Sequence, residues 1–409
     1  MEYVSLSKLF YSDPDNYKTI YHERFNGRNT IHFDFDIHEN KAFLVCEPEL
    51  YNQIIGLYKI NTEIAKLSYS LPGKAIQQFT QKCLIDEIIL TNSIEGVYSS
   101  RKEINSILTD LKAKSRKKRF EGLVQKYLML QENEQLFLNT CEDIRELYDE
   151  LVYTEIEEDD PENLPDGKIF RKDSTSVMSP SQKEIHRGLF PETKIIIYME
   201  KALNILNNQS LQCILRTSVF HYLFGYIHPF YDGNGRTSRY ISSYLLSQEF
   251  DSLIGYQLAY SIKQNSKKYY DAFKICNDTN NLGDLTPFVY MFVDIIDKAL
   301  NQLYEKLKLN YLKLKRYISL INILPHGVSA KYGPLYDLLI QASLFLENGI
   351  SAKELTTYME ISNTTLYKRL NELKPYNLII KKIDENTHYY SLNLKVVDKI
   401  FNETQESKD

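Results

Sequence analysis

The sequence predicts a mainly α-helical protein with more than one domain and only short β-segments. Apolar residues recur at helical spacing through most of the 409 residues, whereas the strict alternation typical of strands is confined to a few short stretches. A glycine-rich turn between two long helical runs marks the centre of the chain. The length is enough for two or three domains with a sizeable core.

Composition excludes some classes of protein. The net charge of −5 at pH 7 gives no overall reason to expect nucleic-acid binding. The sequence has no uninterrupted apolar run of membrane-spanning length and no signal-peptide pattern at its start, so we expect a cytoplasmic protein. The five cysteines are scattered without paired metal-ligand spacing, and we expect reduced, mostly buried thiols.

The first 90 residues combine a hairpin with two helices. Residues 31–37 alternate apolar and polar side chains, and residues 42–46 form a second short strand, so a hairpin should cover part of a helical core. Residues 49–70 and 73–90 carry apolar stripes at helical spacing.

Residues 101–153 read as charged helices, with one or two core helices over 121–153. A basic cluster could bind nucleic acid or an acidic partner, but a solvated helix or loop is favoured because no aromatic residues are interleaved. The cluster consists of Lys112, Lys114, Arg116, Lys117, Lys118 and Arg119.

Acidic residues and prolines crowd residues 154–167, which we expect to form a loop. Two short extended pieces, 167–171 and 174–178, follow around Lys172 and Asp173 and predict a hairpin. Central helices should then occupy residues 192–250.

The turn between the central helices, residues 228–239, carries the chemistry. Gly233 and Gly235 permit backbone turns that other residues resist, and their N–H groups should point, with the start of the next helix, at one spot. Such a nest at the positive end of a helix dipole favours an anion, above all phosphate. Arg236 and Arg239 are three residues apart, so they share a helix face and add positive charge beside the nest.

Two further groups complete this stretch. Asp232 supplies the hard oxygen that Mg²⁺ prefers, with phosphates providing the rest of its shell. His228 can take a proton near neutral pH. The alternative, a plain turn with surface arginines, explains fewer of these residues together. His221, seven residues earlier, is interpreted as a packed or hydrogen-bonded histidine rather than a second base.

Helices continue beyond the turn. One begins at Ser266 and carries Tyr269 and Tyr270, and one or two cover residues 287–324 before Pro325. Residues 334–400 look like a winged helix: helices over 335–347, from Ser351, and over 363–374, then strands over 378–383 and 388–392. In the second helix Ser351 is a natural cap with Glu354 three residues on.

The third helix of this region carries possible phosphate and base contacts, namely Asn363, Thr364, Thr365, Lys368, Arg369 and Lys374. Because the positive charges are few and Glu372 dilutes them, DNA binding and a protein-docking or dimerising role are equally open.

Residues 228–239 resemble the signature of the Fic family, HxFx[D/E]GNGRxxR, at every defining position. The resemblance implies transfer of AMP from ATP to a Ser, Thr or Tyr hydroxyl of a protein, with Mg²⁺. His228 would be the base, Asp232 the Mg²⁺ ligand, and Phe230 a structural anchor. The implied ATP-binding residues are Gly233, Asn234 and Gly235 around the α- and β-phosphates, Arg236 at the β-phosphate, Arg239 at the γ-phosphate, the adjoining Thr237 and Ser238, and Tyr270 at the nucleoside. For Tyr269 and Tyr270, core packing is a nearly equal alternative.

Residues 91–96 resemble the inhibitory motif of that family, [S/T]xxxE[G/N], through Thr91, Glu95 and Gly96. The resemblance implies that Glu95 pairs with Arg239 and misplaces the ATP phosphates; the alternative is a solvated carboxylate at a helix end. The hairpin around Lys172 resembles the family's flap, which aligns an extended target segment, with Arg171 and Val177 as candidates. An ordinary surface hairpin is the alternative.

These expectations give four segments: an N-terminal region over 1–120, a Fic core over 121–305, a helical linker over 306–330 and a winged-helix domain over 331–409. The expected partners are ATP, an unknown target protein and the chain itself through self-modification, with DNA and a homodimer as further possibilities and no membrane. The same site could instead remove AMP from a modified protein, with Glu95 placing a water, or the chain could be a DNA-binding regulator.

Overall fold

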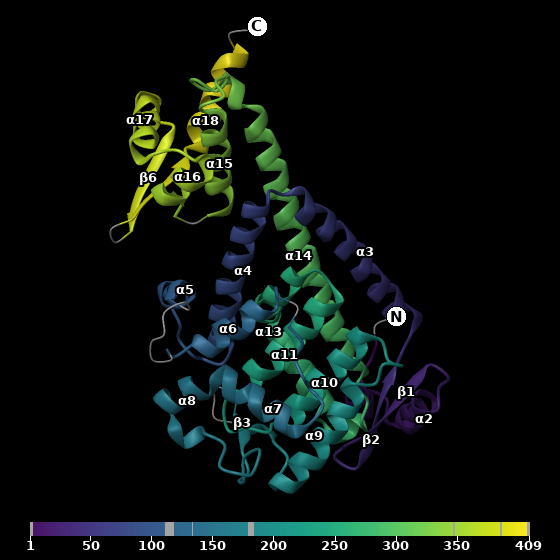
Figure 1. Ribbon diagram of the computed structural model, residues 1–409. Coiled ribbons are helices and arrows are strands. Elements are labelled where there is room, and N and C mark those ends of the chain that lie inside the picture. Colours follow the sequence, from purple (N-terminus) through teal and green to yellow (C-terminus); the bar gives the residue numbers. More distant parts are fainter. Residues whose placement is uncertain are drawn as a thin grey trace. The chain divides into compact units, whose positions relative to one another are not determined.

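The structure is a computed structural model that describes residues 3–110, 118–132, 134–178, 184–346, 348–384 and 387–406. It divides into two compact units, one formed by residues 1–62 and 83–303 and the other by residues 63–82 and 304–409. Helices α3 (Pro48–Ser70), α4 (Gly73–Ile94) and α14 (Thr286–Ser319) contribute residues to both units (Figure 1). The four-segment division by function stays a prediction.

The first unit begins with α1 (Leu6–Ser12), α2 (Pro14–Phe25) and an antiparallel hairpin of β1 (Thr30–Ile37) and β2 (Asn40–Val45). The hairpin predicted from alternation is therefore confirmed. Phe43 of β2 is fully buried, and its backbone bonds to Gly283 and Leu285, just before α14.

Helix α5 (Arg101–Asp110) follows α4. Four residues of the basic cluster, Lys112, Lys114, Arg116 and Lys117, lie outside the described residues. Arg119 is described, and its guanidinium pairs with Asp159.

The acidic segment is helical, so the loop expected over 154–167 is wrong in its first half. After α6 (Glu121–Met129), helix α7 (Cys141–Tyr148) continues through a π-helical turn, η1 (Asp149–Tyr153), into α8 (Thr154–Asp159), with a 3₁₀ turn, η2, at Pro161–Asn163. The helix persists because its inner face is apolar: Leu151, Val152 and Ile156 are buried. The charges that suggested a loop lie mostly on the solvent side.

The hairpin near Lys172 is also differently built. Strand β3 (Ser176–Met178) pairs with β4 (Glu184–Arg187), and residues 167–171 form no strand. The reason is visible at Glu192, whose carboxylate accepts the backbone N–H groups of Ile169 (2.7 Å) and Phe170 (2.9 Å). Those donors are therefore not available for a ladder.

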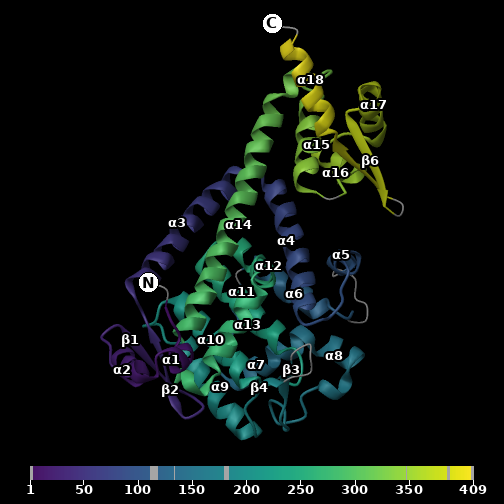
Figure 2. The ribbon, with the colours of Figure 1, turned by 180° about the vertical axis from the view of Figure 1, so that it is seen from behind.

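The centre of the first unit is formed by α9 (Glu192–Leu206), α10 (Cys213–Ile227) and α11 (Asn234–Glu249), as Figure 2 shows from behind. Helix α10 is buried on nearly all sides. The remaining elements are η3 (Ser252–Tyr256), α12 (Leu258–Gln264), α13 (Ser266–Cys276), η4 (Thr279–Asn281) and α14.

The second unit contains η5 (Ile321–Ile323), α15 (Gly333–Phe345), β5 (Ile350–Ser351), α16 (Ala352–Met359), α17 (Asn363–Leu373), η6 (Lys374–Tyr376), β6 (Ile379–Asp384), β7 (Thr387–Leu392) and α18 (Leu394–Glu406). Its antiparallel sheet has the order β5-β7-β6. The predicted helices and strands are present, and the capping box of Ser351 and Glu354 is confirmed. The name winged helix stays a prediction.

Two remaining expectations concern the whole chain. All five cysteines are free thiols, and all but the partly exposed Cys213 are buried. Within the ranges that the structure describes, no helix combines the length and the apolar character needed to cross a membrane.

Candidate active site

The candidate site lies where α10 ends and α11 begins. His228 ends α10 in the left-handed conformation (φ 51°), and its N–H donates to the carbonyl of Phe224 at 2.9 Å. Gly233 precedes α11 with φ 79°, and a Cβ there would come within 2.9 Å of Val152 and 3.0 Å of Tyr148. Only glycine meets both demands, because the backbone is left-handed and the space is filled.

The loop between these residues is fixed by its own side chains. The Asn234 amide accepts from the N–H of Phe230 (3.0 Å) and donates to the Phe230 carbonyl (2.7 Å). The buried Phe230 ring stacks on Tyr148 with centroids 3.7 Å apart. Phe230 thus anchors the loop, and the Asn234 side chain is used to hold it rather than facing outward.

Buried hydrogen-bond donors gather at the start of α11. The first N–H groups of a helix have no partner within it, and the helix dipole makes this end positive. The Nε of Arg236 and the hydroxyl of Thr237 are buried without a hydrogen-bond partner among the described residues. Ser238 instead donates to the Gly235 carbonyl at 3.2 Å. The uncompensated donors suit an anionic ligand.

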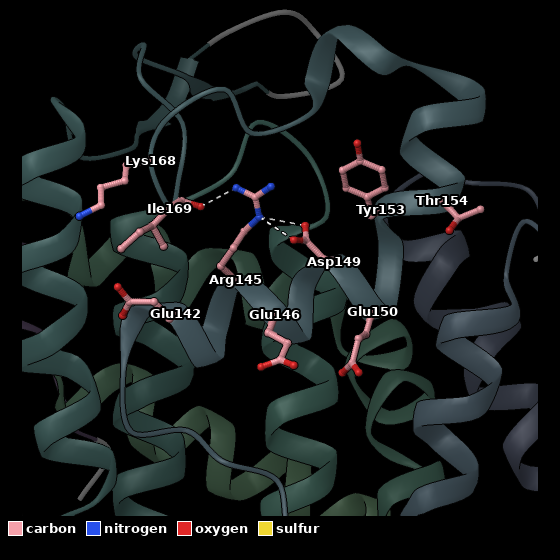
Figure 3. Close-up of a pocket in the computed structure, with 9 residues that line it drawn as sticks. All are labelled: Glu142, Arg145, Glu146, Asp149, Glu150, Tyr153, Thr154, Lys168 and Ile169. Atoms are coloured by element: carbon pink, nitrogen blue, oxygen red, sulfur yellow. Dashed lines mark hydrogen bonds and ion pairs between the residues drawn. The ribbon is translucent and has the colours of Figure 1, made fainter.

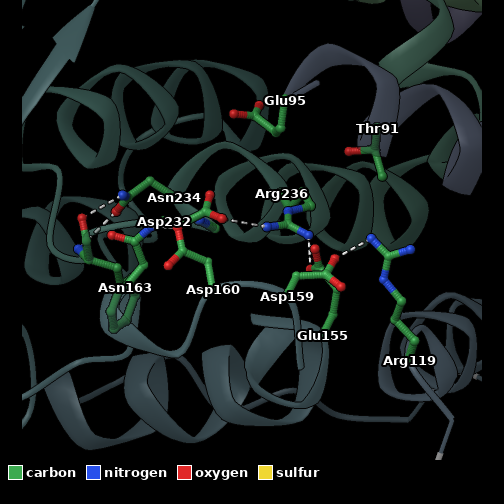
Figure 4. A network of polar contacts seen from close by, with 12 residues as sticks. Thr91, Glu95, Arg119, Glu155, Asp159, Asp160, Asn163, Asp232, Asn234 and Arg236 are labelled. Atoms are coloured by element: carbon green, nitrogen blue, oxygen red, sulfur yellow. Dashed lines mark hydrogen bonds and ion pairs between the residues drawn. The ribbon is translucent and has the colours of Figure 1, made fainter. Parts of the chain in front are cut away.

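Arg236 lies between two carboxylates, as Figure 4 shows. One guanidinium nitrogen pairs with Glu155 of α8, and the other lies 3.3 Å from Asp232. Burial raises the pKa of the Glu155 carboxyl, and the charge of Arg236 lowers it in part. Sequence reasoning missed Glu155, because no local motif marks it and the surrounding acidic residues suggested a solvated loop.

Glu95 and Arg239 form the predicted contact. The Glu95 carboxylate is 2.7 Å from the Arg239 guanidinium, which also donates to the hydroxyl (2.8 Å) and the carbonyl (3.0 Å) of Thr91. Burial, the largest single effect, lowers the pKa of Arg239, but the charge and hydrogen bond of Glu95 together with Tyr269 and Tyr127 more than offset it, so the net pKa is raised. A Cβ on Gly235 would lie 2.2 Å from the same Glu95 oxygen, so the carboxylate rests directly on the glycine turn.

His228 is held by the segment that includes the hairpin. Arg171 is fully buried and donates to the carbonyls of His228 (2.9 Å) and Leu189 (2.8 Å). Burial, together with the nearby His186 and the charge of Arg171, lowers the pKa of His228 to about 3. The imidazole is therefore neutral, the form that accepts a proton. Val177 pairs with His186 across the hairpin.

The two tyrosines of α13 differ in their exposure to solvent. Tyr269 is buried and its hydroxyl bonds to His221 at 2.7 Å, so both residues belong to the core. Tyr270 is 47% exposed. Burial, followed by the negative charge of Glu95, raises its pKa, so the phenol lies within electrostatic reach of the Glu95–Arg239 pair.

A preformed metal site is absent from the part of the chain that the structure describes: no three His, Cys, Asp or Glu side chains gather to hold an ion. Asp232 alone presents a partly exposed carboxylate at the loop. One carboxylate fits Mg²⁺, which is usually bound through one or two carboxylates together with substrate phosphates.

A pocket of about 620 Å³ lies on the outer side of α7, η1 and α8 and is lined by Glu142, Arg145, Glu146, Asp149, Glu150, Tyr153, Thr154, Lys168 and Ile169. In Figure 3 Arg145 is bound between Asp149 and the carbonyl of Ile169. None of the residues predicted for the site lines this pocket, so it is separate from the loop.

Residues 138–246 match the model of the Fic/DOC family. The chain is similar to the proteins named protein adenylyltransferase Fic of Drosophila ananassae and Drosophila persimilis, at 36% and 37% identity over 102 residues. The match covers 25% of this chain and 19% and 18% of the length of those relatives.

Solved structures of Fic proteins also match this chain at low identity. A Fic family protein from Desulfovibrio desulfuricans is 18% identical with a TM-score of 0.48, covering 82% of this chain and 95% of that chain. A Fic-1 structure from C. elegans is 17% identical with a TM-score of 0.43, covering 74% of this chain and 81% of that chain.

Proposed function

We propose that the chain transfers AMP from ATP to a Ser, Thr or Tyr hydroxyl of a target protein, and that the Glu95 carboxylate inhibits this reaction. The observation that supports this most directly is the 2.7 Å contact of Glu95 with Arg239 beside the uncompensated donors of α11. A helix start with two buried arginines is suited to a triphosphate. Glu95 occupies Arg239, the arginine proposed for the γ-phosphate, whereas Arg236 contacts Glu155 and Asp232. The names of the curated relatives agree with AMP transfer.

In the proposed mechanism the phosphates lie over the first turn of α11. The N–H groups of Gly235 and Arg236, together with the Arg236 guanidinium, would stabilise charge that develops on the departing pyrophosphate. A Mg²⁺ ion held by Asp232 and the phosphates would supply further charge neutralisation. The neutral His228 imidazole would accept the proton of the target hydroxyl as its oxygen attacks the α-phosphorus.

Inhibition follows from charge. While Glu95 pairs with Arg239, the γ-phosphate has no free arginine and meets a carboxylate instead. ATP can bind with its phosphates displaced, so that attack is not in line. Removal of the Glu95 carboxylate should therefore activate the chain without any change in the loop.

Mass spectrometry of the purified chain after incubation with ATP and Mg²⁺ tests this proposal. Glu95→Gly should raise self-labelling above that of the wild type, the added mass should be that of an AMP moiety, and His228→Ala in the same background should abolish it. If Glu95→Gly is labelled only at background, the inhibitory role of Glu95 is contradicted. If labelling survives His228→Ala, the assignment of His228 as the base is contradicted.

Removal of AMP from a modified protein is the second candidate. The Glu95 side chain is 27% exposed, so a carboxylate oxygen can reach solvent beside the Gly235 turn and could orient a water. A premodified target incubated with wild type and with Glu95→Gly separates the two directions. Loss of AMP with the wild type alone would favour hydrolysis.

DNA binding by the second unit has weaker support. The exposed face of α17 presents Thr364, Lys368 and Glu372, whereas Arg369 donates to the carbonyl of Lys331 at 2.7 Å. One of the expected phosphate contacts is therefore already engaged. A mobility shift with random duplex DNA, repeated with Lys368→Ala, tests this role.

A further inference from the structure

The Arg236 guanidinium is shared between Glu155 and Asp232 (Figure 4), and the Fic resemblance assigns a role to two of these three residues only. The contact between Arg236 and Asp232 affects cation binding, because Asp232 is the proposed cation ligand. A carboxylate fully engaged by an arginine is a poor metal ligand, since its lone pairs and charge are already compensated.

The two carboxylates are not equivalent partners. The Glu155 side chain is 5% exposed, whereas the Asp232 side chain is 37% exposed. Attraction between charges is stronger where water is excluded, and a buried arginine without a partner is costly. Glu155 is therefore the principal partner of Arg236, and Asp232 is the lesser one.

Glu155 is held in place by packing on the loop itself. Its neighbours Val152 and Ile156 on the η1–α8 segment contact Gly233 so closely that a Cβ there would meet both. One turn further on, Asp159 pairs with Arg119 and ties the end of α8 to the segment before α6. The position of the Glu155 carboxylate relative to Arg236 is thus set by the same contacts that shape the turn.

Without the Glu155 charge, Arg236 would have one acidic partner left among those it contacts in the described residues. The planar guanidinium binds a carboxylate best through two parallel hydrogen bonds, and Asp232 stands four residues earlier, within reach. One Asp232 oxygen already accepts the N–H of Gly233. A two-bond pair with Arg236 would engage both oxygens.

We propose that Glu155 is a positioning residue that holds Arg236 and so keeps Asp232 available to the divalent cation bound with the nucleotide. This inference rests on the proposed ATP site. Glu155 itself touches neither nucleotide nor cation; it acts through the arginine.

Calorimetric titration of ATP at a series of Mg²⁺ concentrations tests the inference in the Glu95→Gly background. Adding Glu155→Gln should raise the Mg²⁺ concentration needed for half-maximal ATP binding by about 10- to 100-fold, the range typical for residues that support a metal ligand. ATP binding in the absence of Mg²⁺ should change much less, because Arg236 keeps its charge. Glu158→Gln, the same chemical change at an exposed position of α8, is the matched control and should leave the Mg²⁺ dependence as it was.

A double-mutant comparison shows whether the effect passes through Asp232. In an Asp232→Asn background, Glu155→Gln should cause no further shift in Mg²⁺ dependence. An equal shift in both backgrounds, or an unchanged Mg²⁺ dependence of folded Glu155→Gln, overturns the inference. If Glu155→Gln does not fold, Glu155→Asp takes its place: its shorter carboxylate should shift the dependence in the same direction by less, and no shift overturns the inference.

The two proposals fail in different ways. If the Glu95→Gly protein binds no ATP at any Mg²⁺ concentration, the proposed function is wrong. If it binds ATP with a Mg²⁺ dependence that Glu155 does not alter, the function stands and only the role of Glu155 is lost.

Discussion

At the residue scale, the shape of the loop depends on one glycine. Gly233 has φ 79°, and a Cβ added there would lie closer to Val152 and Tyr148 than van der Waals contact allows. Gly233→Ala should therefore lower the free energy of unfolding by about 1–3 kcal/mol, through backbone strain and overpacking together. Denaturant unfolding followed by circular dichroism measures the change.

Gly56→Ala is the matched control for that substitution. Gly56 lies within α3, and a Cβ there meets nothing within 4 Å. The same added methyl should stabilise the protein by about 0.5–1 kcal/mol, because alanine is the better helix former. If Gly56→Ala and Gly233→Ala changed the free energy of unfolding equally, the proposed strain at Gly233 would be contradicted.

His228 gives a prediction about pH. Its folded-state pKa of about 3 lies below the ordinary histidine value of 6.5, so the imidazole stays neutral as pH falls from 8 to 5. AMP transfer by Glu95→Gly should therefore show no loss of rate with a midpoint near 6.5 in this range. Initial rates of self-labelling across pH 5–8, with folding checked at each pH, measure it, and an acidic limb near 6.5 would show that the base is more exposed.

At the scale of elements, α4 carries a buried carboxylate, Glu87, in addition to the motif at its end. Glu87 accepts the N–H of Ala259 at 2.7 Å, and its other oxygen is buried without a partner among the described residues. Burial raises its pKa from 4.5 to about 8. The stability that the protonated group contributes is full below pH 4.5 and is lost as pH rises to about 8.

Glu87→Gln should remove this dependence, because the amide keeps an acceptor for Ala259 and carries no charge. The substituted protein should match the wild type near pH 4.5 and exceed it by about 1–4 kcal/mol at pH 8. Urea unfolding at both pH values gives the difference. Glu63→Gln on the exposed face of α3 serves as control, and a Glu87 effect that does not vary with pH would mean that the carboxyl is ionised throughout.

An element could be predicted from the sequence when the residues that determine it lie close together in the chain. The helices α10 and α11 and the capping box of α16 were predicted because periodicity, glycines and caps lie within a few residues of each other. Helix α8 was taken for a loop, since its buried face shows only once Gly233 packs on Val152 and Ile156. The partner of β3 was missed because Glu192, far along the chain, removes the donors of Ile169 and Phe170.

The site residues that belong to a sequence motif could be predicted, and those outside a motif could not. Glu95 and Arg239 are far apart in sequence, and their contact was expected from two motifs read together. Glu155 contacts Arg236 across a separation of 81 residues, and its charge looked like one of many in an acidic run. The sequence holds nothing local that distinguishes a buried carboxylate from its solvated neighbours.

At the scale of the whole molecule, the second unit is discontinuous in sequence. Residues 63–82 belong to it together with residues 304–409, and Lys74 lies 3.4 Å from Glu354 and over the ring of Tyr358. Ile64 and Leu71 in this segment are buried. Because this segment forms one unit with residues 304–409, we expect the burial of these side chains to depend on the C-terminal part.

A chain that ends after Leu303 should therefore expose these apolar side chains, at a cost of about 1.5–3 kcal/mol for each one fully uncovered. We expect a lower thermal midpoint and stronger binding of a hydrophobic dye than in the full chain. A truncated protein that matches the full chain in both measurements would show that residues 63–82 are covered without the C-terminal part.

The glycine at position 235 has a consequence for how the protein can change under selection. The Glu95 oxygen occupies the space that any larger residue at 235 would need, and the proposed nucleotide lies over the same turn. A genetic screen for constitutively active variants should thus recover many replacements of Glu95 and none of Gly235. Both the inhibited state and the proposed nucleotide-bound state require a residue without a side chain at position 235. Substitutions that activate the protein should therefore fall on Glu95 and not on Gly235.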